Sequence, residues 1–343
     1  MKRIESIDIL RGMTIALMIL VNNPGSWTAV YPPLRHAAWN GFTPTDLVFP
    51  LFLFVMGVSM YFSFRKSGFR LSWKVLRRTL LLIGIGLALN WLGRLIGSHS
   101  ASLAGLRLTG VLQRLGLCFG IGAVLVCTLN HKWLPWIALT LLGGYTVLLL
   151  TGNGYAYGAE NLLSRVDRAL IGEAHLYSDN GIDPEGLLST IPSIAHTLTG
   201  FLVGSMVAQK KNRTALWAGI GLVAAGLALS PWLPLNKKIW SPSYTFFTCG
   251  LGTLLLCLLY WLLDEKRRWH RDGFFKAFGT NAIYCYVMSH LVAWLLDGTG
   301  LHGALMGLAG DSAFTSLLYA LLCILLTWLT VLPLFRRGIF LKV

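Results

Sequence analysis

Residues 46–64 read DLVFPLFLFVMGVSMYFSF, and no charged side chain occurs between Leu47 and Phe64. Such a run is long and apolar enough to cross the hydrocarbon core of a bilayer as a helix. Nine further apolar runs lie on either side of it, so we expect an all-α polytopic membrane protein that forms a single transmembrane domain over residues 1–343. The ten expected spans are 7–23, 46–64, 73–93, 108–128, 133–151, 188–208, 214–231, 243–263, 276–296 and 312–334.

Composition supports this class. The chain of 343 residues is 55% hydrophobic and 13% charged, whereas an ordinary soluble domain is about 25% charged. The net charge of +15 would suggest nucleic acid in a soluble protein, but here the basic residues lie in short loops between apolar runs. We therefore expect no nucleic-acid partner.

The chain has no Gly-Lys-Ser/Thr phosphate loop, which argues against an ATP-driven pump. The six cysteines all lie in apolar segments, so we expect neither disulfides nor a metal site.

The distribution of Lys and Arg predicts the orientation. Twenty of the 29 basic residues fall on the side that holds the N-terminus and seven on the other. Basic loops face the cytosol, so both termini are expected there. Residues 152–187 then form a longer extracytoplasmic loop, which is acidic. The first apolar run has no small-residue cleavage site after it, so we interpret it as an uncleaved helix rather than a signal peptide.

Ionisable residues inside spans are costly and often functional. Asp8 and Arg11 are three apart and can pair on one helix face; Arg11 either snorkels to the cytosolic interface or meets an anionic ligand. Arg114 lies about 9 Å into its span, which favours a ligand or ion-pair role. His290, in the outer half of its span, is either an interhelical hydrogen-bonding residue or part of a site.

Polar residues also gather between the first two spans. His36, in the first outer loop, is the side chain best suited to take a proton near neutral pH. Asp46 either completes a capping box with Thr43 and Pro44 or orients His36, and the two roles are compatible. Asn22 either ends the first helix or donates to a developing oxyanion.

Several of these segments resemble the heparan-α-glucosaminide N-acetyltransferase family and its bacterial transmembrane relatives. The most specific block runs from HAAWNG at 36–41 through DLVFP at 46–50 to Gly57. The likeness covers essentially the whole chain. Asn22 departs from the family pattern, because Asn23-Pro24 follows it instead of a run of glycines, so the matching asparagine is Asn22 or Asn23. The other matching segments are SIDILRG at 6–12, GVLQRLG at 110–116, DPEGLL at 183–188 and residues 236–241.

The resemblance implies an integral protein of the bacterial inner membrane that moves an acetyl group from cytosolic acetyl-CoA to the amine of a glucosamine-type sugar outside. The thioester is already activated, so no metal is required. His36 would act as base or, by a second route, as acetyl carrier. The catalytic residues implied are His36, Asn22 and Asp46; acetyl-CoA would meet Arg11, Gln113, Arg114 and Lys238; the amino-sugar acceptor would meet Trp39, Asn40, Glu185 and His290.

Two other functions stay open at this point. One is an O-acetyltransferase that modifies a cell-surface polysaccharide with the same donor. The other is a carrier for a sugar or lipid-linked intermediate, which would need no acetyl-CoA. Partners beyond the bilayer and the two substrates are not specified by the residues, and a homodimer is compatible with them.

Overall fold

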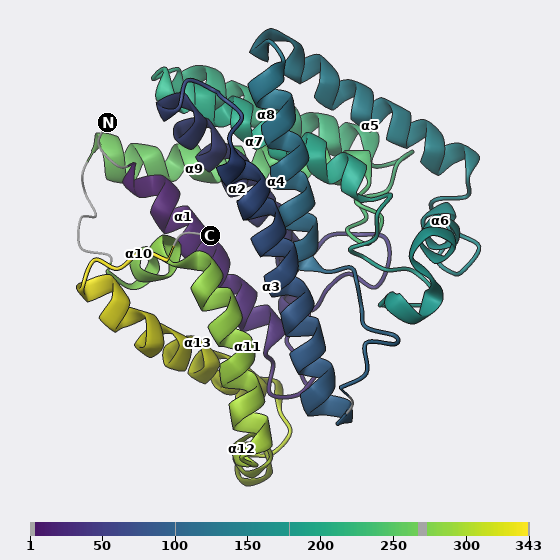
Figure 1. The fold of residues 1–343 in the computed structure, drawn as a ribbon, viewed down its shortest axis with the longest axis vertical. Coiled ribbons are helices and arrows are strands. Elements are labelled where there is room, and N and C mark those ends of the chain that lie inside the picture. Colours follow the sequence, from purple (N-terminus) through teal and green to yellow (C-terminus); the bar gives the residue numbers. More distant parts are fainter. Residues whose placement is uncertain (1–3, 100, 178, 267–272, 342–343) are drawn as a thin grey trace. The chain divides into compact units, whose positions relative to one another are not determined.

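The computed structural model describes residues 4–99, 101–177, 179–266 and 273–341 (Figure 1). The described residues form helices and connecting turns, and a single isolated bridge between Asp179 and Ile182 is their only β pairing. Six basic residues of the predicted cytosolic side lie outside the described residues: Lys2, Arg3, Arg267, Arg268, Arg271 and Lys342.

Among the described residues, eight helices are long and apolar enough to cross a membrane. A ninth candidate is the bent pair Ala282–Gly298 and Leu301–Leu308, whose axes differ by 71°. Helix α1 (Glu5–Asn22) covers the remaining predicted span, but Glu5, Asp8 and Arg11 make it more charged. Every predicted span thus coincides with a helix, and the all-α polytopic class is confirmed. The eight are Pro44–Lys66, Trp73–Ser98, Val111–Thr128, His131–Thr151, Thr190–Ala208, Asn212–Leu229, Pro242–Glu265 and Ala313–Arg336.

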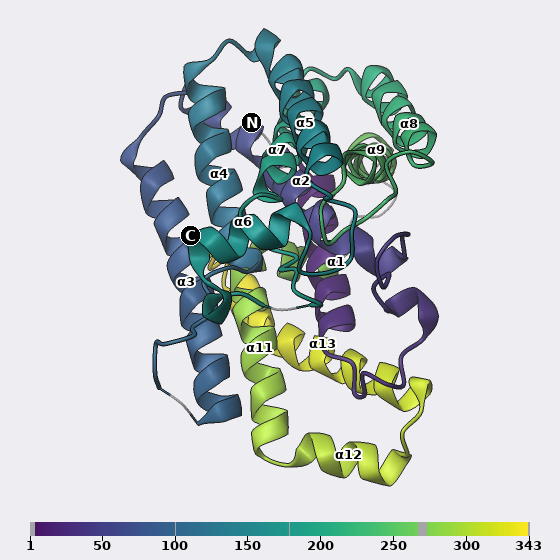
Figure 2. The ribbon, with the colours of Figure 1, turned by 90° about the vertical axis from the view of Figure 1, so that its right-hand side faces the viewer.

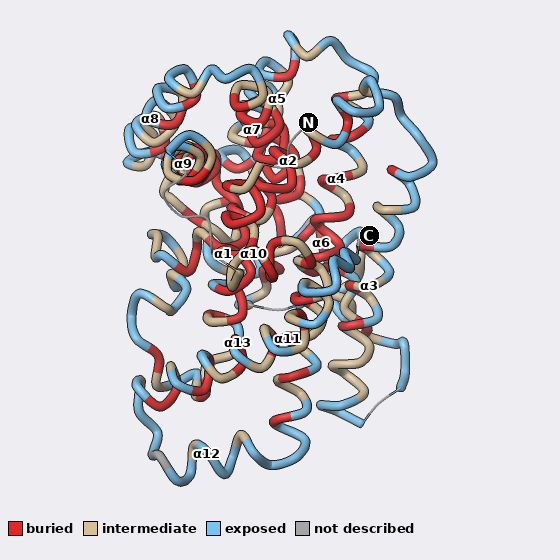
Figure 3. The backbone as a smooth tube through the Cα atoms, turned by 90° about the vertical axis from the view of Figure 1, so that its left-hand side faces the viewer, coloured by how far each residue is buried: buried red, intermediate tan, exposed pale blue. Residues whose placement is uncertain are grey.

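The chain divides into two compact units, and the first comprises residues 1–36, 43–52 and 258–343. In it, α1 packs against α10, α11 and α13. Figure 2 shows α11 leading into α12, and α12 into α13. Most of α12 is exposed, as its pale blue colour in Figure 3 indicates. The elements of this unit are α1, η1 (Pro32–Leu34), η2 (Pro44–Leu47), the π-helical turn η5 (Tyr260–Glu265), α10 (Gly273–Thr280), α11 (Ala282–Gly298), α12 (Leu301–Ala309) and α13 (Ala313–Arg336).

Two devices fix α1 within this unit. Gly12 of α1 and Gly279 of α10 face each other so closely that a Cβ on either would overlap a backbone carbonyl of the opposite helix. At the start of α1, the Asp264 carboxylate accepts the backbone N–H groups of Glu5 and Ser6 at 3.0 and 3.1 Å. A carboxylate at a helix N-terminus satisfies unpaired donors and complements the helix dipole.

The second unit comprises residues 37–42 and 53–257. Helix α7 is mostly buried. It packs against α4 and α5 and meets α2 where Gly57 and Gly200 let the backbones approach. By contrast, α3 and α8 are mostly exposed, and lipid would cover their apolar faces. The helices are α2 (Val48–Lys66, from Leu53 on), α3 (Trp73–Ser98), α4 (Val111–Thr128), α5 (Leu134–Thr151), α6 (Leu162–Ile171), α7 (Thr190–Ala208), α8 (Asn212–Leu229) and α9 (Pro242–Leu259, to Cys257), with short turns η3 (His131–Trp133) and η4 (Glu173–His175).

The predicted outer loop, residues 152–187, is folded rather than extended. It contains α6 and η4, and Asn161 organises its first half. The Asn161 side chain accepts the N–H of Leu163 at 2.8 Å and donates to the carbonyls of Gly154 and Ala156 at 2.6 and 2.8 Å. An N-cap of this kind starts α6 and closes the turn before it.

Candidate active site

In the first unit, His36 and Asp46 form a hydrogen-bonded pair. His36 Nδ1 lies 2.7 Å from Asp46 Oδ1, and the side chains are 38% and 1% exposed respectively. A buried carboxylate is an acceptor, so Nδ1 carries the proton in this pair. Nε2 of the exposed ring is then the acceptor, which is the tautomer a general base needs.

Thr43 holds both members of this pair. Its backbone N–H donates to Asp46 Oδ2 at 3.0 Å, and its hydroxyl lies 2.7 Å from the Arg35 carbonyl and 3.1 Å from Asp46 Oδ2. The hydroxyl has one proton, and the shorter contact assigns it to the carbonyl directly before His36. The predicted capping box is confirmed, and Asp46 caps and contacts His36 at the same time.

The two asparagines at the end of α1 differ. Asn23 donates its amide to the Ile19 carbonyl at 2.9 Å, which is the contact of a helix-ending residue. Asn22, the last residue of α1, is exposed. Of the two, Asn22 therefore keeps the accessible side chain that an oxyanion donor requires, and this role stays a prediction.

The turn after Asn23 is anchored by residues that sequence reasoning did not select. His302 Nε2 of α12 lies 2.8 Å from the Gly25 carbonyl, and the Gly25 N–H donates to the Ser316 carbonyl of α13 at 3.2 Å. Both partners are nearly 300 residues away along the chain, so no local pattern marks them.

Arg11 pairs with Asp8, as the three-residue spacing predicts. Their Nη1 and Oδ1 atoms are 3.5 Å apart, and Nη1 also donates to the Gly279 carbonyl at 3.0 Å. The Arg11 side chain is 25% exposed. These contacts fit a structural role in the α1–α10 crossing, and contact with CoA stays a prediction.

In the second unit, Arg114 and Gln113 are buried at the start of α4. Arg114 Nη2 donates to the Gly186 carbonyl at 2.9 Å and contacts the Ser189 hydroxyl. Gln113 is 5% exposed and its amide lies against Gly86 of α3. These contacts join α4 to α3 and to the segment at Gly186 and Ser189, which indicates a structural role. The assignment of both residues to acetyl-CoA stays a prediction.

Glu185 belongs to an ion-pair group centred on Arg107. Arg107 Nη2 lies 2.9 Å from Asp183 Oδ1 and 2.7 Å from Glu185 Oε2. Burial alone would lower the pKa of Arg107, but Glu185 and Asp183 raise it overall. The Asp183 carboxylate also accepts from Thr109 and from the Tyr177 N–H. Sequence reasoning singled out the acidic motif but missed its basic partner, which lies more than 70 residues earlier.

Asp167 of α6 supports the same segment. Its Oδ1 accepts the Leu187 N–H at 2.9 Å, and the residue is fully buried. Burial raises the pKa of this carboxyl to about 6. Residues 183–187 are thus held by Arg107 and Arg114 from the α3–α4 region and by Asp167 from α6.

Trp39 packs onto the folded outer loop. Its ring stacks on Tyr157 with centroids 4.7 Å apart, and its Nε1 donates to the Tyr155 carbonyl at 3.0 Å. Lys238 Nζ lies 5.0 Å from the Tyr157 centroid and forms an ion pair with Asp179. The structure thus groups Lys238, expected at acetyl-CoA, with Trp39, expected at the acceptor.

Asn40 and His290 complete the predicted set. Asn40, an exposed residue, accepts the Asn236 amide through its Oδ1 at 3.1 Å. His290 Nδ1 lies 3.0 Å from the Tyr286 carbonyl, and its ring lies beside Tyr286 and Trp294. The hydrogen bond described for His290 is therefore within α11 rather than between helices.

The all-helical fold and the His36–Asp46 pair together define a class. It is that of a multi-pass membrane protein in which a buried carboxylate is hydrogen-bonded to a histidine in the loop between the first two spans. Residues 3–230 match the family model described as heparan-alpha-glucosaminide N-acetyltransferase, catalytic. The chain belongs to this family. The heparan-alpha-glucosaminide N-acetyltransferases of Homo sapiens and Mus musculus are each 31% identical to it, over 83% of this chain. The alignment covers 52% and 53% of these relatives, so the chain spans about half their length.

Proposed function

We propose that this protein is a transmembrane acetyltransferase. It moves the acetyl group of acetyl-CoA to the amine of a glucosamine-type sugar at the extracytoplasmic side of a bacterial inner membrane. Family membership supports acetyl transfer, since the relatives carry that activity in their names. The observation that carries the proposal for this chain is the pair of exposed His36 and buried Asp46, 2.7 Å apart.

His36 acts as the general base. The amine attacks the thioester carbonyl carbon and loses one proton, which His36 Nε2 accepts. The C–N bond forms, the C–S bond breaks, and CoA leaves as a thiolate that takes a proton in turn. Asp46 stabilises the imidazolium that exists between these events. Asn22 donates to the carbonyl oxygen while it carries negative charge.

Arg11, Gln113, Arg114 and Lys238 remain our candidates for acetyl-CoA, and Trp39, Asn40, Glu185 and His290 for the acceptor. Two of these candidates are accessible: the Arg11 side chain is 25% exposed and Asn40 is exposed. Mutagenesis should start with these, because the buried Arg114 and Gln113 already contribute to packing.

The test is acetyl transfer by purified protein in proteoliposomes, with labelled acetyl-CoA and glucosamine. We expect His36→Ala to lower turnover by about 10²–10⁴, the usual contribution of a positioned base, with acetyl-CoA binding nearly unchanged. His99→Ala, at another exposed histidine, is the matched control and should retain activity. Full N-acetylation by a folded His36→Ala protein would reject the assignment.

The same assay separates the alternatives. Labelled protein formed without acceptor, and lost in His36→Ala, would indicate an acetyl-histidine route. Transfer to N-acetylated sugars, which lack a free amine, would indicate O-acetylation. Sugar uptake without any consumption of acetyl-CoA would indicate a carrier.

A further inference from the structure

Helix α12 of the first unit is short and mostly exposed, yet one of its faces is packed. Among positions 301–308, whose burial is described, only His302 and Met306 are not exposed. They are four apart, so they share one face of the helix. Both lie against Gly25: His302 Nε2 is 2.8 Å from the Gly25 carbonyl, and a Cβ on Gly25 would be 2.6 Å from Met306 Sδ. The packed face of α12 therefore contacts the turn that follows α1.

This turn is bonded on both sides of Gly25. Before it, Asn23 donates its side-chain amide back into α1 at 2.9 Å. After it, the Ser26 N–H donates to the Ser316 hydroxyl at 3.0 Å, and that hydroxyl donates to the Ser26 carbonyl at 3.2 Å. The Ser316 carbonyl also accepts the Gly25 N–H at 3.2 Å. Asn22 begins the turn, so these bonds fix the backbone that carries its side chain.

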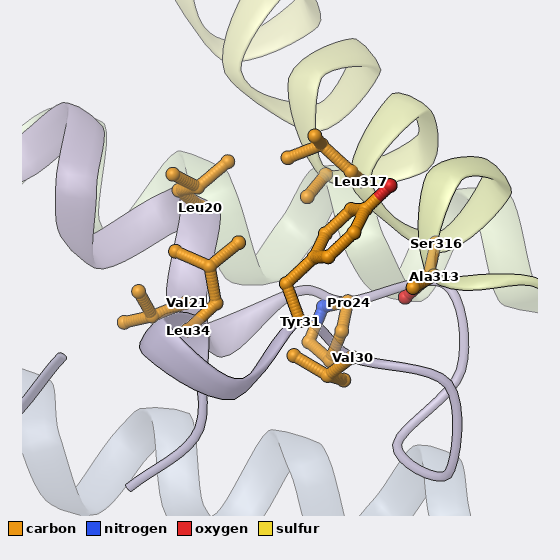
Figure 4. Close-up of a pocket in the computed structure, with 10 residues that line it drawn as sticks. Leu20, Val21, Pro24, Val30, Tyr31, Leu34, Ala313, Ser316 and Leu317 are labelled. Carbon is orange, nitrogen blue, oxygen red and sulfur yellow. The ribbon is translucent and has the colours of Figure 1, made fainter. Parts of the chain in front are cut away.

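The bonded segment continues to His36. Arg35 Nη2 donates to the Thr28 carbonyl at 2.8 Å, and the Arg35 carbonyl accepts the Thr43 hydroxyl at 2.7 Å. The segment also packs on α13 around a small pocket (Figure 4), whose lining includes Pro24, Tyr31, Ser316 and Leu317. Asn22 and His36 therefore lie at the two ends of one segment that α12 and α13 hold in place.

We propose that His302 is a positioning residue for acetyl transfer. Its bond to Gly25 fixes the turn that presents Asn22, so that the Asn22 amide meets the thioester oxygen while His36 takes the proton. The proposal rests on the acetyltransferase function and adds a residue that acts through the turn rather than on either substrate. A carbonyl only accepts, so His302 Nε2 carries the proton in this bond. The role therefore requires an N–H at this place and not the imidazole ring as such.

Two substitutions separate the N–H from the ring, because the glutamine amide nitrogen lies as many bonds from Cβ as His302 Nε2 does. With labelled acetyl-CoA and glucosamine in proteoliposomes, His302→Leu should lower kcat by roughly 2- to 10-fold, the effect of one hydrogen bond. KM should change little. His302→Gln should recover most of kcat, and equal losses in the two variants would overturn the proposal. Leu308→Ala, at a 90% exposed position of α12, is the control and should match wild type.

A double-mutant cycle tests whether the effect passes through Asn22. Asn22→Ala should itself lower kcat by about 10²–10³, the usual effect of removing one oxyanion donor. Adding His302→Leu to Asn22→Ala should then cause no further loss, whereas a second 2- to 10-fold loss would overturn the proposal. Full activity of Asn22→Ala would overturn it too, while leaving the acetyltransferase function standing. Absence of transfer by the wild-type protein would instead reject the function, and the positioning role with it.

Amide hydrogen exchange gives a readout without turnover. Residues 23–28 should exchange faster in His302→Leu than in wild type, because the turn loses one of its bonds. His302→Gln and Leu308→Ala should exchange as wild type does. Unchanged exchange in His302→Leu would show that the turn does not depend on His302 and would refute the positioning role.

Discussion

At the scale of single residues, Thr43 makes contacts that serve both folding and chemistry. Its backbone N–H holds one oxygen of Asp46 while His36 holds the other, and its hydroxyl reaches the carbonyl before His36. A carboxylate with both oxygens engaged has little freedom to rotate. Thr43 is therefore a positioning residue: it touches no substrate but fixes the group that orients the base.

We expect Thr43→Val to lower kcat by roughly 2- to 10-fold with little change in KM, because one hydrogen bond contributes about 0.5–1.5 kcal/mol. Thr43→Ser restores the hydroxyl and should recover most of kcat. Steady-state kinetics of the three proteins provide the measurement. Val keeps the methyl group of Thr43 and Ser keeps its hydroxyl, so equal impairment of the two variants would contradict a role specific to the hydroxyl.

At the scale of helices, the α2–α7 crossing depends on the absence of a side chain. A Cβ on Gly200 would overlap the carbonyl of Phe54, and a backbone atom cannot move aside as a side chain can. Gly57 makes the reciprocal approach to the Thr197 carbonyl. Small residues at such crossings let helix backbones pack closely inside membranes, where the hydrophobic effect contributes little.

Gly200→Leu should therefore separate α2 from α7 and lower the thermal midpoint, since overpacking costs roughly 1–3 kcal/mol or more. Gly84→Leu is the control: it lies within α3, where an added Cβ meets nothing within 4 Å. Thermal unfolding in one detergent compares the two. Equal midpoints for both variants would contradict a close α2–α7 contact.

At the scale of the whole molecule, the alternation of basic and acidic loops predicts the topology. Residues near 70 and 211 are expected in the cytosol, and the folded segment 152–187 outside. That segment has contacts of its own and contacts with the region before α4: Asn161 caps α6, and Arg107 pairs with Asp183 and Glu185.

Single cysteines in a background without native cysteines test this orientation in intact cells. An impermeant thiol reagent should label Ala174→Cys and should leave Ser72→Cys and Lys211→Cys unlabelled until the cells are broken. All three positions are exposed in the structure, so burial does not explain protection. Labelling of all three from outside would overturn the predicted topology.

The sequence by itself determined the spans, the capping box and the link between His36 and Asp46. Each of these depends on short-range properties. The bilayer requires long apolar runs wherever the chain crosses it, and capping acts over three residues. His36 and Asp46 are ten residues apart, and the loop between them leads directly into the second span. A short-range argument therefore predicted their contact as well.

Only the tertiary structure decided which distant groups meet. Arg107 pairs with Asp183 and Glu185, Trp39 stacks on Tyr157, and Asp264 caps α1 across more than 250 residues. The small pocket lined by Leu20, Tyr31 and Ala313 is likewise built from α1, a loop and α13. Which helix faces which is set by side-chain packing and hydrogen bonding between segments. These pairings leave no periodic signal in the sequence, because each depends on a contact between two distant residues and not on a repeated spacing.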